Sequence, residues 1–426
     1  MSYPVVRRLE VWRQLERGGR VLAGTLAQNR QGVFFQYADD YLGQYKSLSP
    51  FALASDLSLQ SAPAAPHGGL HGVFADSLPD GWGLMLMDRV FRQAGVLPDQ
   101  VTAMDRLAFV GERGAGALQY CPVSALGSPV DQHASSLAEL GLNAQALFDG
   151  QTTQLLAELV RAGSSGGARP KAQLYLSDND SDLCSTSPVQ GMSPYLVKFT
   201  SAQLALGHEE GLCEAVYLEL ARRAGIDVPG WRLLNAPAAS GAKAWLALER
   251  FDCTSAGGRL HLHSACGLLG ADFRLPSLDY VDLIKASSML CKSPAAGQEQ
   301  FRRAIFNLFA VNQDDHSKNW AFLQNDKGDW QLAPFYDVTF SPGPYGEHAT
   351  AYGGFGKAPP LKVMQTLADV ANFSGWAQAQ EVIRVVAAAI ADWNEVAEHF
   401  GVSIETRRLV SEQLNAVYAQ NRGLLG

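Results

Sequence analysis

The stretch FRRAIFNLFAVNQDDHSKNWAFLQNDKGDWQLAPFYD, residues 301–337, decides the fold. Its first part has apolar residues at helical spacing (Phe301, Ile305, Leu308 and Phe309), which predicts an amphipathic helix that is buried on one face and ends near Val311. The polar run 312–319 follows at once. A run this hydrophilic directly after a buried helix indicates a loop held at a functional site.

A β-hairpin is predicted next. Residues 320–323 and 330–334 are rich in apolar and aromatic side chains, and the turn-forming sequence Asn-Asp-Lys-Gly at 325–328 separates them. Asp337 follows directly after the second strand, so the hairpin places it near the loop that precedes the first strand.

The acidic and amide residues of this stretch have the spacing of a phosphoryl-transfer site. Asp314 is followed five positions later by Asn319, and Asp337 comes just past a hairpin, as in protein kinases. This arrangement predicts Asp314 as the base that accepts the hydroxyl proton, and Asn319 and Asp337 as oxygen ligands for Mg²⁺. The competing reading is that these are ordinary turn residues. Asp315 competes with Asp314 but misses the spacing by one residue.

The segment resembles the HipA-like serine/threonine kinases of bacterial toxin–antitoxin modules, whose catalytic segment reads D-x-H-x-K-N followed by F-Y-D. In this chain, residues 314–319 match the first pattern and residues 335–337 match the second. The resemblance implies an α+β, two-lobed protein-kinase-like fold with an N-terminal β-rich subdomain of HipA type and a helical C-terminal lobe. The expected divisions are 1–125, 126–255 and 256–426.

A glycine-rich turn, 163–172, precedes the predicted strand 173–176. Glycines let backbone N–H groups approach phosphates, and Arg169 or Lys171 adds charge, although a flexible loop is the plainer interpretation. It lacks the G-K-[ST] and following helix of a Walker A loop. The resemblance makes it the family's Gly-rich loop, with a self-phosphorylated serine at Ser164 or, alternatively, Ser165. Its implied nucleotide-binding residues are Gly166, Gly167, Ala168 and Lys171.

Lys198 ends a short apolar strand, 193–199. A cation among apolar neighbours has to be paired, and in a kinase this lysine holds the α and β phosphates. Glu214, on the predicted helix 208–224, is a candidate partner, and three other glutamates near it compete: Glu209, Glu210 and Glu219.

The predicted strand 244–252 ends in the family's tetrapeptide E-R-F-D. The resemblance implies that the chain passes between the lobes here and that backbone groups near Glu249 and Phe251 meet adenine. It also places His316, Lys318 and Tyr336 at the nucleotide.

Other segments are expected to be structural. An antiparallel sheet opens the chain at 8–37, with a turn at 29–32, and Asp80 is expected to cap a helix that runs to about Gly95. The glycines of 111–116 are not a nucleotide loop, because a strand rather than a helix follows. Helices are further predicted over 132–162, 376–400 and 403–420.

Composition narrows the function. The 426 residues carry a net charge of −8, which argues against coating nucleic acid by bulk charge. Neither a signal peptide nor a run of about 18 apolar residues is found, so a cytoplasmic protein without membrane contact is expected. Six scattered cysteines predict buried thiols rather than zinc or disulfides, and the histidine pairs 67/71 and 261/263 are assigned to surface or packing.

The function implied is an ATP- and Mg²⁺-dependent serine/threonine protein kinase that acts as a growth-inhibiting toxin on a translation-related protein, such as an aminoacyl-tRNA synthetase, and on itself. Its implied partner is a HipB-like helix-turn-helix antitoxin, through which alone it meets DNA. Two alternatives stay open: a small-molecule phosphotransferase of the aminoglycoside type, which shares D-x-x-x-x-N, and a non-catalytic ATP-binding corepressor or scaffold.

Overall fold

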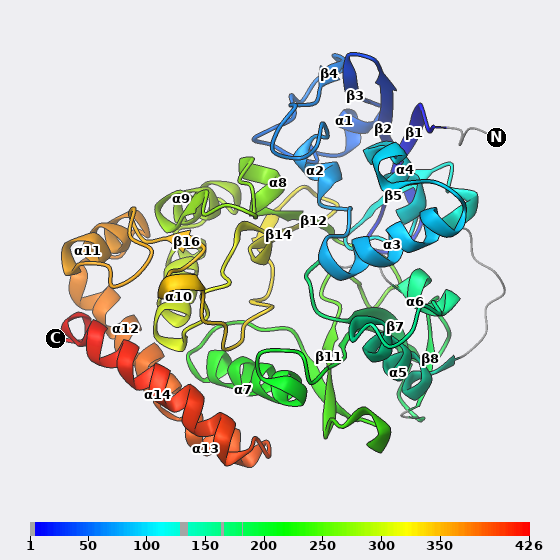
Figure 1. Cartoon of the computed structure of the whole chain (residues 1–426). Coiled ribbons are helices and arrows are strands. Elements are labelled where there is room, and N and C mark those ends of the chain that lie inside the picture. The colour runs from blue at the N-terminus through cyan, green and yellow to red at the C-terminus, as the bar shows by residue number, and fades with distance from the viewer. Residues whose placement is uncertain (1–4, 128–134, 163–165, 181) are drawn as a thin grey trace.

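The computed structural model describes residues 5–127, 135–162, 166–180 and 182–426. Its N-terminal part is an antiparallel sheet in the strand order β4-β3-β2-β1-β5, drawn in blue and cyan in Figure 1. Alternate side chains of β1 are buried, as the period-2 pattern predicts, and the turn at 29–32 joins β2 to β3. The strands are β1 (Arg8–Gln14), β2 (Arg20–Asn29), β3 (Gly32–Tyr37), β4 (Gln60–Ser61) and β5 (Leu118–Cys121), and the helices beside them are α1 (Tyr41–Gln44), α2 (Gly72–Ala75), α3 (Gly81–Gln93) and α4 (Ala103–Val110).

A second antiparallel sheet, in the order β10-β11-β9-β7-β8-β6, carries the Gly-rich loop and Lys198. Residues 132–162 are predicted to be helical, and within the described residues they form two helices, so the prediction is wrong for 149–156. The first helix ends at Asp149, where Gly150 takes the left-handed φ of 71°. The strands are β6 (Ser135–Ser136), β7 (Lys171–Ser177), β8 (Leu183–Ser185), β9 (Met192–Lys198), β10 (Trp231–Asn235) and β11 (Ala244–Glu249), and the helices are α5 (Leu137–Phe148), α6 (Ala157–Ala162) and α7 (Glu210–Arg223).

The remainder is mostly helical. The predicted hairpin forms, and β14 also pairs with β12. The helix predicted over 376–400 is two helices that meet at Asp392, whereas Ser403 caps the last long helix as expected. The helices are α8 (Ala265–Leu269), α9 (Tyr280–Leu290), α10 (Pro294–Ala310), α11 (Leu361–Val370), α12 (Trp376–Ala391), α13 (Trp393–His399) and α14 (Ile404–Asn421), and the strands are β12 (His261–Ser264), β13 (Leu278–Asp279), β14 (Ala321–Gln324), β15 (Trp330–Leu332) and β16 (Thr350–Ala351).

Helix α7 belongs to both lobes. Its buried residues, among them Val216 and Leu220, share one apolar core with Leu246 of β11 and with Phe306 of α10. Figure 1 shows α7 between β11 of the second sheet and the helices of the C-terminal part. The same helix therefore fixes the sheet that carries Lys198 relative to the segment that carries Asp314 and Asp337.

Buried polar contacts join the first sheet to the rest. Asp76 accepts hydrogen bonds from Ser264 Oγ at 2.5 Å and contacts His263 Nδ1 at 2.6 Å, and His263 Nε2 lies 2.8 Å from Ser49 Oγ. These three residues form a hydrogen-bonded series of the Ser-His-Asp kind that is also found in hydrolases. Ser49 and His263 are fully buried, so the contacts serve packing rather than catalysis, as expected for that histidine. No helix of the described ranges is long and apolar enough to cross a membrane.

The cysteines are reduced and only partly follow expectation. Three are buried and three are half-buried: Cys121 at the end of β5, Cys291 at the end of α9, and Cys253 in the turn after β11.

Candidate active site

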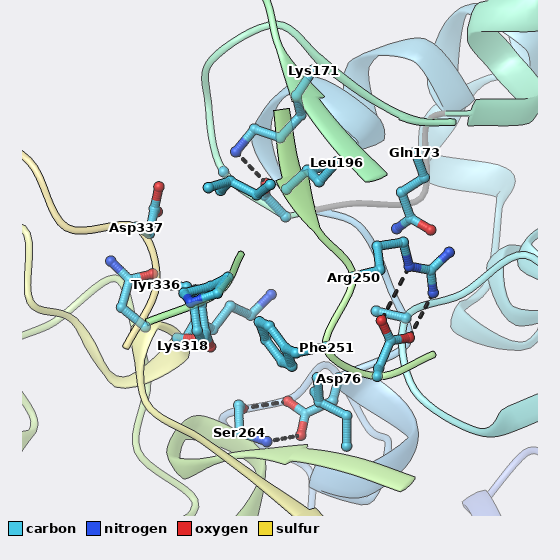
Figure 2. A pocket seen from close by; sticks show the side chains of 18 of the residues that line it. Asp76, Lys171, Gln173, Leu196, Arg250, Phe251, Ser264, Lys318, Tyr336 and Asp337 are labelled. Carbon is cyan, nitrogen blue, oxygen red and sulfur yellow. Dashed lines mark hydrogen bonds and ion pairs between the residues drawn. The ribbon is translucent and has the colours of Figure 1, made fainter. Parts of the chain in front are cut away.

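A pocket of about 200 Å³ lies where the three parts of the chain meet. Figure 2 shows side chains converging on it, with Asp337 on one side and Arg250 on the opposite side. Nearly all the residues expected from the sequence at the nucleotide or metal line it: Gly166, Gly167, Lys171, Lys198, Glu249, Phe251, His316, Lys318, Asn319, Tyr336 and Asp337. Segments up to 171 positions apart in the sequence, from 166 to 337, are thus brought to one cavity.

Lys198 is the centre of the charged end. Its Nζ lies 2.6 Å from Glu214 Oε1 on α7 and 2.6 Å from Asp337 Oδ1. Burial alone would lower the pKa of Lys198, but the carboxylates of Asp337 and Glu214 outweigh it and raise that pKa. Lys198 is therefore a buried, charged lysine that links a strand of one lobe to the loop of the other.

The competing glutamates are engaged elsewhere. Glu210 pairs with Arg169 at 3.1 Å, Glu209 accepts hydrogen bonds from Ser403, and Glu219 binds Arg222. Geometry thus selects Glu214 among the glutamates that spacing left open.

Asp337 has an unusual backbone. Its φ is 54°, in the left-handed region that asparagine and aspartate enter more readily than other side chains. Burial would raise its pKa, but Lys198 and Lys171 outweigh burial and hold the pKa of Asp337 well below its ordinary value. The side chain is therefore ionised and aimed at the lysine by a strained turn.

The loop after α10 separates two adjacent aspartates. The helix ends at Val311, whose φ is 54°, and the chain then turns so that the Asp314 side chain is 62% exposed while Asp315 is buried. Asp315 accepts a hydrogen bond from Tyr280 at 2.6 Å and from the Thr350 backbone at 3.1 Å. Asp315 therefore holds the loop in place, and Asp314 is left free for chemistry.

Asp314 does not itself line the pocket. Its Oδ1 lies 3.8 Å from His316 Nε2, and its backbone carbonyl accepts a hydrogen bond from Asn319 Nδ2 at 2.8 Å. Surrounding protein atoms raise the pKa of Asp314, and the negative charge of Asp337 raises it further. A carboxylate with a raised pKa is a stronger proton acceptor.

The Gly-rich loop is held by a residue that the sequence assigned to another task. Asp80 occupies the position before α3, but its side chain does not cap that helix. Instead its Oδ1 accepts a hydrogen bond from the Gly167 backbone and its Oδ2 lies 2.6 Å from Lys318 Nζ. Asp80 thus connects the N-terminal part to both the Gly-rich loop and the catalytic segment.

Close backbone packing explains two glycines beside Asp80. A Cβ on Gly81 would lie 2.6 Å from the Gly167 carbonyl, and Trp82 donates its backbone N–H to that carbonyl at 2.9 Å. A Cβ on Gly167 would lie 2.5 Å from Lys171 Nζ, which donates to the Gly166 carbonyl at 2.8 Å. The glycines therefore permit a contact that side chains would block.

The opposite end of the pocket is apolar and aromatic. The rings of Phe251 and Tyr336 lie 5.4 Å apart, and Tyr336 donates to the Lys318 carbonyl at 2.7 Å. Behind them Arg250 forms two hydrogen bonds to Asp252, seen in Figure 2. This end suits a flat, uncharged group, whereas the Lys198 end suits phosphates.

The donor set fits a magnesium nucleotide. Asp337 Oδ2 and Asn319 Oδ1 have no hydrogen-bond partner among the described residues, and oxygen atoms of this kind are what Mg²⁺ takes alongside phosphate and water. Two atoms of residues that line the same pocket, His316 Nδ1 and Gln173 Oε1, are buried without a hydrogen-bond partner among the described residues. Within the described ranges no group of three or more His, Cys, Asp or Glu side chains forms a metal cluster.

Among the expected site residues that the structure describes, Ala168 and Asp314 do not line the pocket. Ala168 is exposed and does not line it, because the loop turns outward between Gly167 and Pro170. Ser164 and Ser165 lie outside the described residues. Six polar lining residues were not assigned to the site from the sequence: Asp76, Asp80, Gln173, Arg250, Asp252 and Ser264. The role given to Asp80 was that of a helix cap.

Fold and site together define a two-lobed, kinase-like α+β protein. Family models agree: one described as the HipA-like C-terminal domain matches residues 163–403, more than half of the chain, and one described as the HipA N-terminal domain matches residues 18–121. The chain belongs to the HipA family.

Individual relatives support this. A Sinorhizobium fredii protein named "Putative kinase Y4mE" is 29% identical over 359 residues, which are 78% of this chain and 77% of that protein. "Putative kinase Y4dM" of the same organism is 30% identical over 164 residues, 36% of this chain and 39% of that one. A structure of the Shewanella oneidensis toxin–antitoxin system HipA, HipB and its operator DNA matches with a TM-score of 0.69 at 18% identity, covering 97% of this chain and 96% of that one, and confirms the expected fold.

Proposed function

We propose that this chain is an ATP- and Mg²⁺-dependent serine/threonine protein kinase that acts as a growth-inhibiting toxin. The observation that carries the proposal is the bridge from Lys198 to both Glu214 and Asp337 in a pocket that Asn319 also lines. In kinases a lysine held by a glutamate binds the nucleotide phosphates. The proposed division of the chain stays 1–125, 126–255 and 256–426.

Each group has a proposed role. Lys198 and Lys171 offset the charge that spreads over phosphate oxygens, and Asp314 accepts the proton of the attacking serine hydroxyl as its oxygen bonds to the γ phosphorus and ADP leaves. Asn319 and Asp337 would hold Mg²⁺, which neutralises phosphate charge when bound. Phe251 and Tyr336 would face adenine, with Glu249, His316, Lys318 and the loop residues 166–168 around the nucleotide.

The biological setting is also proposed. The Shewanella complex holds HipA with HipB and operator DNA. By likeness, the partner here is a HipB-like helix-turn-helix antitoxin, DNA is met only through it, and the protein acts in the cytoplasm on a translation-related target, such as an aminoacyl-tRNA synthetase, and on its own Ser164 or Ser165.

Incubation with ATP labelled on the γ phosphate tests the chemistry. Label on Ser164 or Ser165, lost in Asp314→Asn, supports the toxin-type kinase, whereas label only on an aminoglycoside or similar small molecule favours the small-molecule phosphotransferase. If Asp314→Asn still inhibits growth and binds its partner, the non-catalytic scaffold is correct instead.

Nucleotide binding tests the metal ligands separately. Asn319→Ala and Asp337→Ala are each expected to abolish the Mg²⁺-dependent part of ATP binding, measured by calorimetry with and without Mg²⁺. Unchanged binding in both variants would remove these residues from the metal site.

A further inference from the structure

A second pocket, of about 640 Å³, adjoins the far end of the nucleotide pocket and shares Gln173 and Arg250 with it. Figure 2 shows both side chains on the side of the first pocket that lies opposite Asp337. The second pocket is lined by the N-terminal part around Arg113, by residues 186–194 and by the loop 253–259. None of the proposed kinase chemistry uses it.

This pocket is basic in an acidic protein. Four arginines line it but only one acid, Glu112, whereas the whole chain has a net charge of −8. Glu112 is itself engaged by Arg20 at 2.7 Å. The four arginines are Arg113, Arg161, Arg250 and Arg259. The pocket therefore has a local excess of positive charge, which attracts anions.

Asp252 neutralises part of this charge. It contacts Arg250 at 2.6 Å and Arg259 at 3.4 Å, so two guanidinium groups share one buried carboxylate. Arg259 also donates to the Gly114 carbonyl at 2.9 Å. One positive charge of this pair is left without a counter-charge.

Arg113 and Arg161 have less negative charge near them than Arg250 and Arg259 do. Among the described residues no carboxylate lies within 4.0 Å of Arg113, whose nitrogen atoms donate to the carbonyls of Phe109 at 2.5 Å and Val160 at 3.5 Å. The one carboxylate within 4.0 Å of Arg161 in the described part of the chain is that of Glu158, at 4.0 Å. Burial, together with the positive charge of Arg161, lowers the pKa of Arg113 to about 10. Two neighbouring, poorly compensated cations at one cavity are stabilised when an anion enters.

We propose that this pocket binds a small molecule that carries more than one phosphate group. Guanidinium groups bind phosphate through paired hydrogen bonds, and several of them favour a multiply charged ligand. Hydroxyl groups supply further donors, and the volume is that of a small-molecule site. The lining hydroxyl residues are Tyr175, Thr186, Ser187, Ser193, Thr254 and Ser255.

Inorganic tripolyphosphate, titrated into the full chain by calorimetry, tests the site. Arg161→Gln is expected to weaken binding about tenfold, and Arg161→Lys, which keeps the charge but not the planar fork, by less. Arg222→Gln is the matched control, because Arg222 also pairs with a glutamate three residues before it and is exposed. Thermal melting confirms that each variant is folded.

Other outcomes overturn the proposal. A loss confined to Lys198→Gln would place tripolyphosphate in the nucleotide pocket, and equal losses in Arg161→Gln and Arg222→Gln would mean unspecific charge. If citrate binds as tightly as tripolyphosphate, the ligand is a polycarboxylate. If duplex DNA competes more tightly than tripolyphosphate binds, the pocket is a DNA contact. If tripolyphosphate shows no saturable binding, there is no site. Since binding alone is measured, failure here leaves the proposed kinase activity untouched.

Discussion

Asp314 and Asp252 stand at opposite ends of the site, and their surroundings push their pKa values in opposite directions. Asp314 is 62% exposed; its pKa is raised by neighbouring protein atoms and by Asp337. Asp252 is buried; burial would raise its pKa, but Arg250 and Arg259 outweigh burial and lower it to about 2. The opposed charge of Asp314 suits its proposed role as a base, whereas the favoured charge of Asp252 neutralises two buried arginines.

The largest expected difference between the two aspartates is in the rate of phosphorylation. Asp314→Asn is expected to reduce the phosphorylation rate roughly 10³-fold, because the base is lost while the shape is kept. The melting temperature is expected to stay the same or rise, since a charge with a raised pKa does not stabilise the fold. A labelled-ATP assay and a thermal melt on the same preparation measure both. Asp369→Asn, on the exposed side of α11, is the control.

If Asp314→Asn unfolds the protein, or if it phosphorylates as fast as the unchanged chain, then the contrast between the two aspartates is mistaken.

Asp252→Asn is expected to reduce stability and to leave the phosphorylation rate nearly unchanged. Removing the carboxylate leaves the buried guanidinium groups of Arg250 and Arg259 facing each other, at a cost of about 3 kcal/mol in the free energy of unfolding. Denaturant unfolding measures this loss. Activity per folded molecule is expected to remain within about threefold, since Asp252 touches no reacting group. An inactive but fully stable variant would reverse the assignment.

The stabilisation by Asp252 also depends on pH. Its pKa falls from 3.8 in the unfolded chain to about 2 in the folded one, so the contribution is complete above pH 5 and declines as the pH falls toward 2. A shift of this size corresponds to about 2.5 kcal/mol. The stability difference between the unchanged chain and Asp252→Asn should therefore shrink by roughly 1 kcal/mol between pH 7 and pH 3. A difference that grows in acid would contradict the ionised state.

The sequence predicted correctly those elements that depend on residues close together in the chain. The helix that ends at Val311, the hairpin after it and the strand of Lys198 all form, because apolar spacing and turn residues act within a short span. The spacing from Asp314 to Asn319 favours Asp314 over Asp315 as the base, and this assignment stays a prediction. The burial of Asp315 against Tyr280 and Thr350 is consistent with it.

What sequence could not supply are contacts between distant segments. Nothing near Asp80 indicates Lys318, 238 positions away, and an aspartate before a helix is normally its cap. The same holds for the arginine pocket, whose members come from positions 113 to 259. The choice of Glu214 among four glutamates likewise needed the rotation of α7, which spacing alone leaves undetermined to within a turn.

Asp80 offers the smallest and most specific test, because it lies between the two ends and touches both the Gly-rich loop and the catalytic segment. Asp80→Asn keeps an oxygen for the Gly167 backbone but loses the charge that holds Lys318, so the loop is less well placed over phosphate. The KM for ATP is expected to rise about tenfold with a smaller change in kcat. Steady-state kinetics measures the split between the two constants.

Asp88→Asn is the matched control, because Asp88 lies on α3 and pairs at 2.6 Å with Arg106, away from the pocket. If both variants raise the KM for ATP equally, the effect comes from loosening α3 in general. If only Asp80→Asn does so, the effect comes from the contacts that the Asp80 carboxylate makes with Gly167 and Lys318.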